Sequence, residues 1–203
     1  MNSKFHNAYV ITGNIGSGKS TVVNMLKLYG FSVIDADKIS HDVLDKSSDK
    51  IAKEFGKEFV SGSNVDRKKL GALVFKDREK LKLLESILHP QIRSIIYEKA
   101  HFLEDKGLPY FIDIPLYFEK NAYNFDKVVL IYAPEHILLH RVISRDRLSK
   151  EDAKLRLSTQ IDIEEKVAKS QFVIKNDGNL KNLNLEINNF IEKLKENYAT
   201  LKI

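Results

Sequence analysis

The sequence predicts an α/β fold in which a doubly wound, five-stranded parallel sheet forms the core. Five short runs rich in Val, Ile, Phe and Tyr indicate the strands, and longer segments with helical spacing separate them. Several of these runs are continuously apolar, which is typical of strands buried on both faces of a parallel sheet. Strands that alternate with helices form βαβ units, and such units build a doubly wound sheet.

The elements follow one another in a regular order. The expected strands are AYVIT (8–12), FSVID (31–35), YFIDIP (110–115), KVVLIYA (127–133) and FVIKN (172–176). The expected helices cover residues 18–29, 38–55, 77–106, 135–147, 150–168 and 180–200. The last helix carries apolar residues at helical spacing, so we expect it to pack on the sheet.

Two segments are larger or more charged than a crossover between strands requires. Residues 36–109 hold several helical patterns and the turn-like stretch FVSGSNVDR, which indicates an inserted helical subdomain. Residues 140–165 are heavily charged, which fits a mobile lid. We therefore expect a single domain over residues 1–203. Its expected parts are a core (1–37, 107–139 and 166–203), a helical insert (38–106) and a lid (140–165).

The composition excludes several classes of protein. A chain of 203 residues, 43% of them hydrophobic, supports one well-buried core. The net charge of +5 favours polyanionic partners, or reflects an ordinary solvated basic surface. With no cysteine, a disulfide scaffold, a thiolate nucleophile and a Cys-ligated zinc site are excluded. The chain shows neither a membrane-length apolar run nor a signal-peptide pattern, so we expect a soluble, cytoplasmic protein with no membrane partner.

The stretch GNIGSGKST (13–21) fits the phosphate-loop pattern G-x-x-x-x-G-K-[ST] between a strand and a helix. Glycines let the backbone curl so that N–H groups face phosphate oxygens, and the helix amino terminus adds partial positive charge. Lys19 would reach the β- and γ-phosphates of ATP, and the Ser20 hydroxyl would bind Mg²⁺. The alternative is an ordinary glycine-rich turn. The expected nucleotide-binding residues are Asn14, Ile15, Gly16, Ser17, Gly18, Lys19, Ser20 and Thr21.

Other features narrow the kind of nucleotide-binding protein. The chain lacks the Asn-Lys-x-Asp sequence of GTPases, and Asp113 ends the third strand without the following glutamate of many ATPases. A short core, an inserted acceptor-binding subdomain and an arginine-rich lid are typical of P-loop kinases of nucleotides and other metabolites. The sequence therefore predicts an enzyme that transfers a phosphoryl group.

Carboxylates at strand ends are the candidates for handling the acceptor. Asp35 and Asp37 follow the second strand, and strand carboxyl ends face the ligand crevice of a doubly wound sheet. Asp37 is the candidate base for the acceptor hydroxyl, while Asp35 would support it or contact the metal shell. Helix capping is the alternative role for both. Asp113 would hold a magnesium-bound water, or serve as a structural hydrogen-bonding group beside Pro115.

Arginines in the lid are the candidates for stabilising the transferred group. Arg141 and Arg145 share one face of an expected helix. A guanidinium placed over the γ-phosphate neutralises the charge that develops in the transition state. We expect Arg145 to act in this way and Arg141 to contact the nucleotide. The alternative is a solvated basic helix paired with nearby carboxylates.

With these residues in place, the chain resembles the dephospho-CoA kinase family over nearly its whole length. The resemblance implies ATP- and Mg²⁺-dependent phosphorylation of the ribose 3′-hydroxyl of dephospho-coenzyme A, with Asp37 as candidate base. It rests on the blocks TGNIGSGKST, VIDADKISHDV, VDRKKLGALVF, LESILHPQIR, DIPLYFE, FDKVVLIYA, RVISRDRLSKEDAKLRLSTQ and FVIKNDG.

The resemblance also assigns further residues. Arg67 and the His89–Pro90 turn would contribute to the acceptor site, and Asn176 would lie near the adenine of ATP. Independently of the resemblance, we also expect Asp113 to bind the substrate. A structural role is the alternative for Arg67, paired with Asp66 or Glu58, and for His89. Three residues depart from the family pattern: Asn14 replaces a usual glycine, Tyr117 a leucine and His140 a glutamine.

Two other functions remain open from the sequence. One is a nucleoside or nucleotide kinase with a different acceptor. The other is a protein that senses ATP or binds nucleic acid, which the basic charge favours. The positive residues are scattered without interleaved aromatic residues, so we expect no nucleic-acid partner. A monomer or small homo-oligomer is expected.

Overall fold

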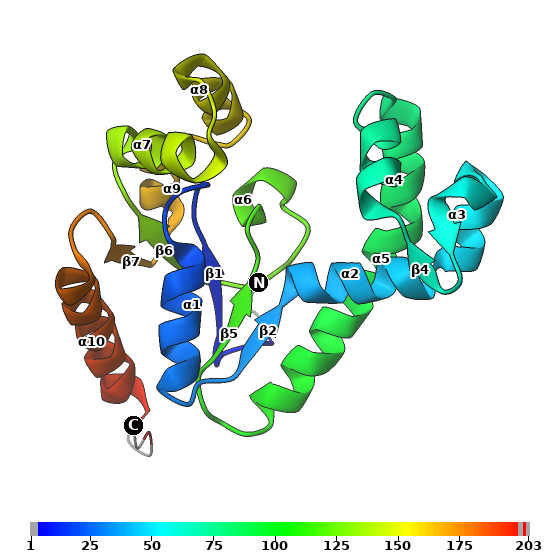
Figure 1. Cartoon of the computed structure of the whole chain (residues 1–203). Coiled ribbons are helices and arrows are strands. Elements are labelled where there is room, and N and C mark those ends of the chain that lie inside the picture. Colours follow the sequence, from blue (N-terminus) through cyan, green and yellow to red (C-terminus); the bar gives the residue numbers. More distant parts are fainter. Residues whose placement is uncertain (1–3, 199–200, 202–203) are drawn as a thin grey trace. The chain divides into compact units, whose positions relative to one another are not determined.

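The structure is a computed structural model that describes residues 4–198 and Leu201 (Figure 1). The chain divides into two compact units. The sheet unit consists of Met1–Ile34 and Ala100–Ile203, and the insert unit consists of Asp35–Lys99. The expected division into core, insert and lid remains a prediction.

Five strands form one sheet in the order β2-β5-β1-β6-β7, and the predicted parallel α/β fold is confirmed. In the central strand, Val10 lies opposite Ile112 on one side and Val128 on the other. All five residues of this strand are buried, as its continuous apolar sequence predicts. The strands are β1 (Ala8–Thr12), β2 (Val33–Asp35), β5 (Tyr110–Asp113), β6 (Lys127–Tyr132) and β7 (Phe172–Lys175).

Helices cover both faces of this sheet. Val129 and Ile131 of β6 belong to a core cluster with α1 (Lys19–Leu28) and α10 (Leu180–Asn197). Leu130, which points to the opposite face because side chains alternate along a strand, packs with α7, α8 and α9. The expected packing of the last helix on the sheet is confirmed. Its expected last two residues, 199–200, lie outside the described residues.

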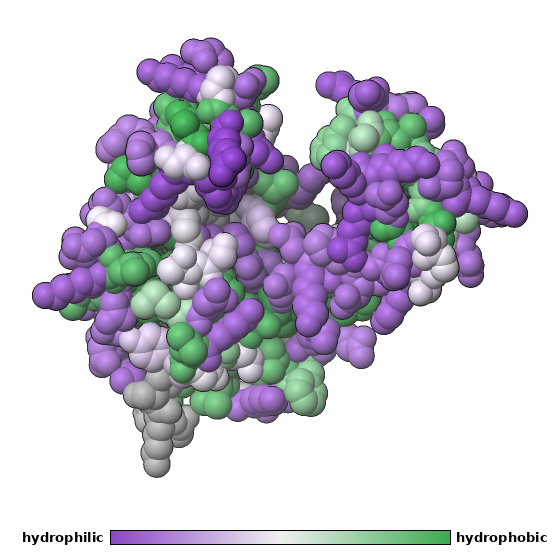
Figure 2. All heavy atoms as spheres, viewed as in Figure 1, coloured by the Kyte–Doolittle hydropathy of each residue, from purple (hydrophilic) through white to green (hydrophobic). Residues whose placement is uncertain are grey.

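The lid segment forms two helices after α7 (Glu135–Asp146) instead of the single expected helix. These are α8 (Lys150–Ser158) and α9 (Ile163–Lys169). The break has a local cause, because the Asp162 side chain accepts a hydrogen bond from the Glu164 N–H (2.8 Å) and so begins a new helix. Hydrophilic side chains are prominent over α8 in Figure 2.

The insert unit contains helices and a small hairpin. The single helix expected over 38–55 is two helices, α2 (Ala36–Lys46) and α3 (Ser48–Phe55), which meet at Ser47. The turn-like stretch forms the hairpin of β3 (Val60–Ser61) and β4 (Asn64–Val65), with Gly62 at a φ of 61°. A 3₁₀ helix (Lys57–Phe59) precedes the hairpin, and α4 (Arg67–Val74) and α5 (Arg78–Glu104) follow it.

The turn expected at His89–Pro90 is wrong, because Pro90 lies inside the long helix α5. A proline within a helix removes one backbone hydrogen bond. Beside it, the Gln91 side chain donates from Nε2 to the Ile87 carbonyl (2.8 Å) and adds a hydrogen bond at the disturbed turn. Among the described helices, none is both long and apolar enough to cross a bilayer.

Candidate functional site

The phosphate-loop stretch connects the carboxyl end of β1 to the start of α1. Gly18 is the residue that precedes α1, and it adopts a left-handed backbone (φ 83°), as does Gly16 (φ 84°). A β-carbon on Gly18 would lie 2.1 Å from Nδ2 of Asn176, so a larger residue here would displace that side-chain amide. The loop therefore needs glycine both for its backbone angles and for the closeness of its neighbours.

Two side chains of the sheet unit donate hydrogen bonds to backbone carbonyls of the loop. Arg141 in α7 donates from Nη1 to the Gly16 carbonyl (3.2 Å). Asn176, which follows β7, donates from Nδ2 to the Ser17 carbonyl (2.7 Å). Two residues expected to bind nucleotide thus contact the loop directly, and they fix carbonyl groups of the loop.

Unlike these loop carbonyls, several N–H groups of the loop have no hydrogen-bond partner among the described residues. Within residues 4–198 and 201, no hydrogen bond engages the backbone N–H of Gly16 or of residues 18–20. Successive N–H groups at a helix amino terminus form a binding site for an anion, and the helix dipole adds to the attraction. The loop therefore presents donors that fit phosphate oxygens.

Lys19 and Asp113 are brought together in the sheet unit. The Lys19 ammonium lies in contact with the Asp113 carboxylate, and only 16% and 12% of the two side chains is exposed. Asp113 ends β5, which neighbours β1 in the sheet, so both residues lie at the carboxyl ends of adjacent strands. This is the edge at which doubly wound sheets bind ligands.

The donor set at this edge fits a hard cation only in part. Ser20 supplies a hydroxyl at the exposed start of α1, and Asp113 supplies a carboxylate. No group of three or more His, Asp or Glu suited to a metal occurs among the described residues. Mg²⁺ commonly takes one or two protein ligands and completes its shell with phosphates and water. The residues present therefore fit Mg²⁺ that arrives with a nucleotide.

The lid arginines differ in their surroundings. Arg145 is largely exposed and pairs with its neighbour Asp146 (2.8 Å). Asp146 also pairs with Arg156 of α8 (2.8 Å), and hydrogen bonding from Arg145 lowers the pKa of this carboxyl. Arg145 therefore lies in a charged cluster with Asp146 and Arg156, whereas Arg141 contacts the phosphate loop.

The remaining predicted site residues belong to the insert unit. Asp35 caps α2 by accepting a hydrogen bond from the Lys38 N–H (2.9 Å), so the capping alternative holds for this residue. Asp37 is exposed in the first turn of the same helix. His89 lies 4.0 Å from Glu85, one turn earlier in α5.

Arg67 has a partner that the sequence did not indicate. It pairs with Asp45 (2.6 Å), rather than with Asp66 or Glu58. Asp45 also accepts a hydrogen bond from the Val65 N–H (3.0 Å). This backbone hydrogen bond, and then Arg67, lower the pKa of Asp45.

Sequence reasoning missed further polar contacts of the loop. The Ile15 N–H donates to Oε1 of Gln160 (2.8 Å), and the Asn14 side chain donates from Nδ2 to the Ile161 carbonyl (3.0 Å). Gln160 ends the block RVISRDRLSKEDAKLRLSTQ, one of those on which the family resemblance rests. No spacing rule connects this block to a loop about 145 positions earlier.

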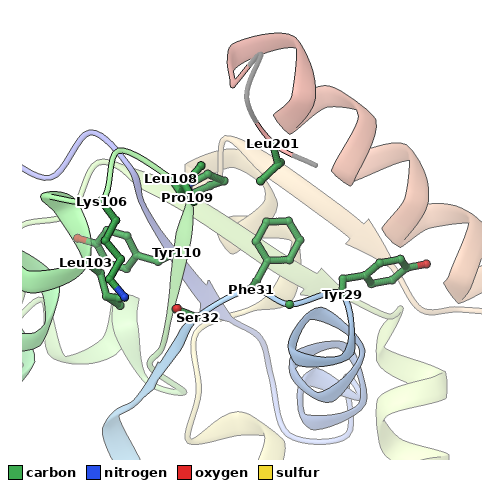
Figure 3. A pocket seen from close by; sticks show the side chains of 10 residues that line it. Tyr29, Phe31, Ser32, Leu103, Lys106, Leu108, Pro109, Tyr110 and Leu201 are labelled. Atoms are coloured by element: carbon green, nitrogen blue, oxygen red, sulfur yellow. The ribbon is translucent and has the colours of Figure 1, made fainter. Parts of the chain in front are cut away.

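A separate pocket of about 270 Å³ lies at the amino end of β5 and the carboxyl end of α1 (Figure 3). Phe31, Leu103 and Leu108 line it, together with Lys106. Because β1 and β5 are parallel, this pocket is at the opposite edge of the sheet from the phosphate loop. It includes none of the predicted site residues.

Comparisons with known proteins agree on one family. A family model described as dephospho-CoA kinase matches residues 9–182. The dephospho-CoA kinase of Sulfurimonas denitrificans is 46% identical over 198 residues, which cover 98% of this chain and 99% of that protein. The solved dephospho-CoA kinase from Campylobacter jejuni is 38% identical, with a TM-score of 0.76, and covers 94% of this chain and 98% of its own. A shikimate kinase structure from Bacteroides thetaiotaomicron is 14% identical (TM-score 0.52; 93% and 98% covered) and shows the shared P-loop kinase fold alone.

Proposed function

The chain belongs to the dephospho-CoA kinase family, and we propose that it transfers the γ-phosphoryl group of ATP to the ribose 3′-hydroxyl of dephospho-coenzyme A. The products are coenzyme A and ADP, and the reaction is the final step of coenzyme A biosynthesis. The observation that carries the proposal is the phosphate loop. Arg141 and Asn176 donate hydrogen bonds to its backbone carbonyls, and the N–H groups of residues 18–20 stay available to bind phosphate oxygens.

The proposed mechanism distributes the work among few residues. Lys19 and the loop N–H groups bind the β- and γ-phosphates and stabilise negative charge on them. Asp37 accepts the proton of the acceptor hydroxyl, and Arg145 neutralises charge on the transferred group when the lid closes. A closed lid also keeps water from taking the phosphoryl group. Ser20 and Asp113 would hold Mg²⁺, which would supply electrostatic stabilisation of the phosphates.

Further residues bind the substrates in this proposal. Arg141, Asn176 and the loop residues Asn14 to Thr21 bind ATP. The acceptor site includes Asp37, Arg67, His89 and Asp113. Asp113 thus serves both the acceptor and the metal shell. A monomeric or small homo-oligomeric state, a cytoplasmic location and the absence of a nucleic-acid partner remain predictions from the sequence.

The fold alone does not select the acceptor, since a shikimate kinase shares it at 14% identity. The test is ADP release in a coupled assay, with ATP, Mg²⁺ and one acceptor at a time. We expect turnover with dephospho-coenzyme A and none above background with coenzyme A, whose 3′-hydroxyl is already phosphorylated. Turnover of a nucleoside monophosphate without turnover of dephospho-coenzyme A would overturn the proposal.

A further inference from the structure

Two consecutive residues of the phosphate loop are joined to two consecutive residues of the lid segment. Ile15 donates its N–H to Gln160, and Asn14 donates its side-chain amide to the Ile161 carbonyl, at 2.8 and 3.0 Å. Gln160 and Ile161 lie between α8 and α9, so the two hydrogen bonds connect the segment between these helices to the phosphate loop. The first half of the loop is thereby fixed from the side of α8 and α9.

A buried ion pair holds Ile161 in place. The Ile161 N–H donates to Oε1 of Glu119 in α6 (Tyr117–Lys120) at 3.2 Å. The same oxygen lies 2.6 Å from Nζ of Lys166 in α9, whose side chain is fully buried. Charged groups out of contact with water keep their partners, because separation leaves an uncompensated buried charge. Glu119 and Lys166 therefore fix the position of Ile161, and with it that of Gln160.

We propose that Gln160 is a positioning residue: it orders the phosphate loop for ATP binding. The Glu119–Lys166 pair keeps Gln160 in place. The inference rests on the proposed function, since it concerns how the same site binds the triphosphate. Gln160 touches the loop backbone at Ile15 and carries no charge. It orders the loop without competing for the phosphates.

The physical reason lies in the order of the loop before ATP binds. Its N–H donors, at Gly16 and residues 18–20, follow the residues that Gln160 and Ile161 hold, and two of these donors belong to glycines with left-handed backbone, Gly16 and Gly18. Glycine backbones rotate readily when they are not held. A loop that is already fixed loses less conformational entropy when the phosphates bind, and this strengthens binding.

The test compares two glutamines that accept the same kind of hydrogen bond. Gln171 accepts from the Val128 N–H at 2.8 Å, at the amino end of β7 and away from the phosphate loop. Gln160→Leu and Gln171→Leu each remove one such acceptor. We expect Gln160→Leu to raise the KM for ATP by roughly fivefold to tenfold, with kcat within about threefold of wild type, because a bond of this kind supports binding rather than chemistry. The KM for dephospho-coenzyme A stays within about twofold.

Gln171→Leu is expected to leave the KM for ATP unchanged. It should lower the melting temperature by about as much as Gln160→Leu does. If both variants show the same KM for ATP, Gln160 is merely structural and the inference fails. Gln160→Met, which keeps an unbranched side chain, is the second variant and carries the same expectation should the leucine variant not fold.

Direct calorimetric binding of ADP separates this inference from the proposed function. A wild-type chain that binds ADP but does not phosphorylate dephospho-coenzyme A would contradict the proposed function alone. Weaker ADP binding by Gln160→Leu than by Gln171→Leu would still support the positioning role. Equal ADP binding by the two variants would overturn it.

Discussion

The ammonium of Lys19 contacts the carboxylate of Asp113, where the first turn of α1 meets the carboxyl end of β5. The lysine charge is thus held in a mostly buried position beside the phosphate loop. Preorganised charge of this kind favours a transition state that gains negative charge.

Replacement of Lys19 should therefore remove most of the activity. We expect Lys19→Met to lower kcat/KM by roughly 10²- to 10³-fold in the ADP-release assay, the range seen when one preorganised donor is lost. Lys195→Met, at a half-buried lysine of α10 that pairs with Glu192, is the control and should retain activity. Activity of Lys19→Met within about tenfold of wild type would contradict the role given to this lysine.

The two aspartates that follow β2 should behave differently. Asp37→Asn is expected to lower kcat by about 10²- to 10⁴-fold, the usual contribution of a general base. Asp35→Asn should change kcat by less than about tenfold and leave stability intact, since asparagine caps a helix as well as aspartate does. The base assignment is wrong if both Asp37→Asn and Asp37→Ala lose less than about tenfold in single-turnover rate.

Two glycines with similar positive φ values allow the strain of a left-handed backbone to be distinguished from crowding by a neighbouring side chain. Gly18 and Gly30 have φ values of 83° and 89°, but a β-carbon on Gly30 meets nothing within 4 Å. Alanine at either position introduces left-handed strain of about 1–2 kcal/mol. At Gly18 it also displaces the Asn176 amide from the Ser17 carbonyl.

Both alanine variants should therefore melt at lower temperature than the wild type, and only Gly18→Ala should bind ADP poorly, by about tenfold or more in calorimetry. Equal ADP affinity in Gly18→Ala and Gly30→Ala would show that the packing of Asn176 against the loop is unimportant for binding.

Acidic pH should weaken the insert unit through Asp45. The hydrogen bond from Val65 and the charge of Arg67 hold the folded-state pKa of Asp45 below its ordinary 3.8. Its contribution to stability is complete above 3.8 and is lost as the pH falls through the lower folded-state value. Asp45→Asn should reduce the free energy of unfolding at pH 7 by up to about 1 kcal/mol, since the pair is partly exposed.

Urea melts at pH 7 and at acidic pH measure this difference, which should shrink as wild-type Asp45 becomes protonated. Glu79→Gln, in an exposed pair with Lys82, is the control and should change stability by less than about 0.5 kcal/mol. A difference between Asp45→Asn and wild type that is constant from pH 7 to strongly acidic pH would contradict the assignment.

The sequence predicted the sheet and the phosphate loop because both depend on local patterns. Continuous apolar runs gave all five strands, and the spacing of Gly13, Gly18 and Lys19 located the loop. Helix boundaries were less predictable where a break falls within a helical pattern. Asp162 caps α9 through its side chain, whereas Ser47, between α2 and α3, makes no side-chain capping hydrogen bond.

Contacts between distant segments were not predictable from one sequence. Gln160 contacts Ile15 because the fold brings these two residues together. For the same reason Arg67 pairs with Asp45 rather than with acidic residues nearer in sequence. Pro90 illustrates the opposite error. Its usual preference for helix ends was overridden by the packing of α5, in which Ile96 and Ala100 are fully buried.

The complete enclosure of the Lys166 side chain makes this residue a natural reporter of opening in the native protein. Amine-reactive reagents modify lysines that water can reach, so they will spare Lys166 for as long as α9 stays against α6. The rate at which it becomes acylated therefore measures how often α9 separates from α6, and a bound nucleotide that slows acylation would reveal that binding at the phosphate loop tightens this contact.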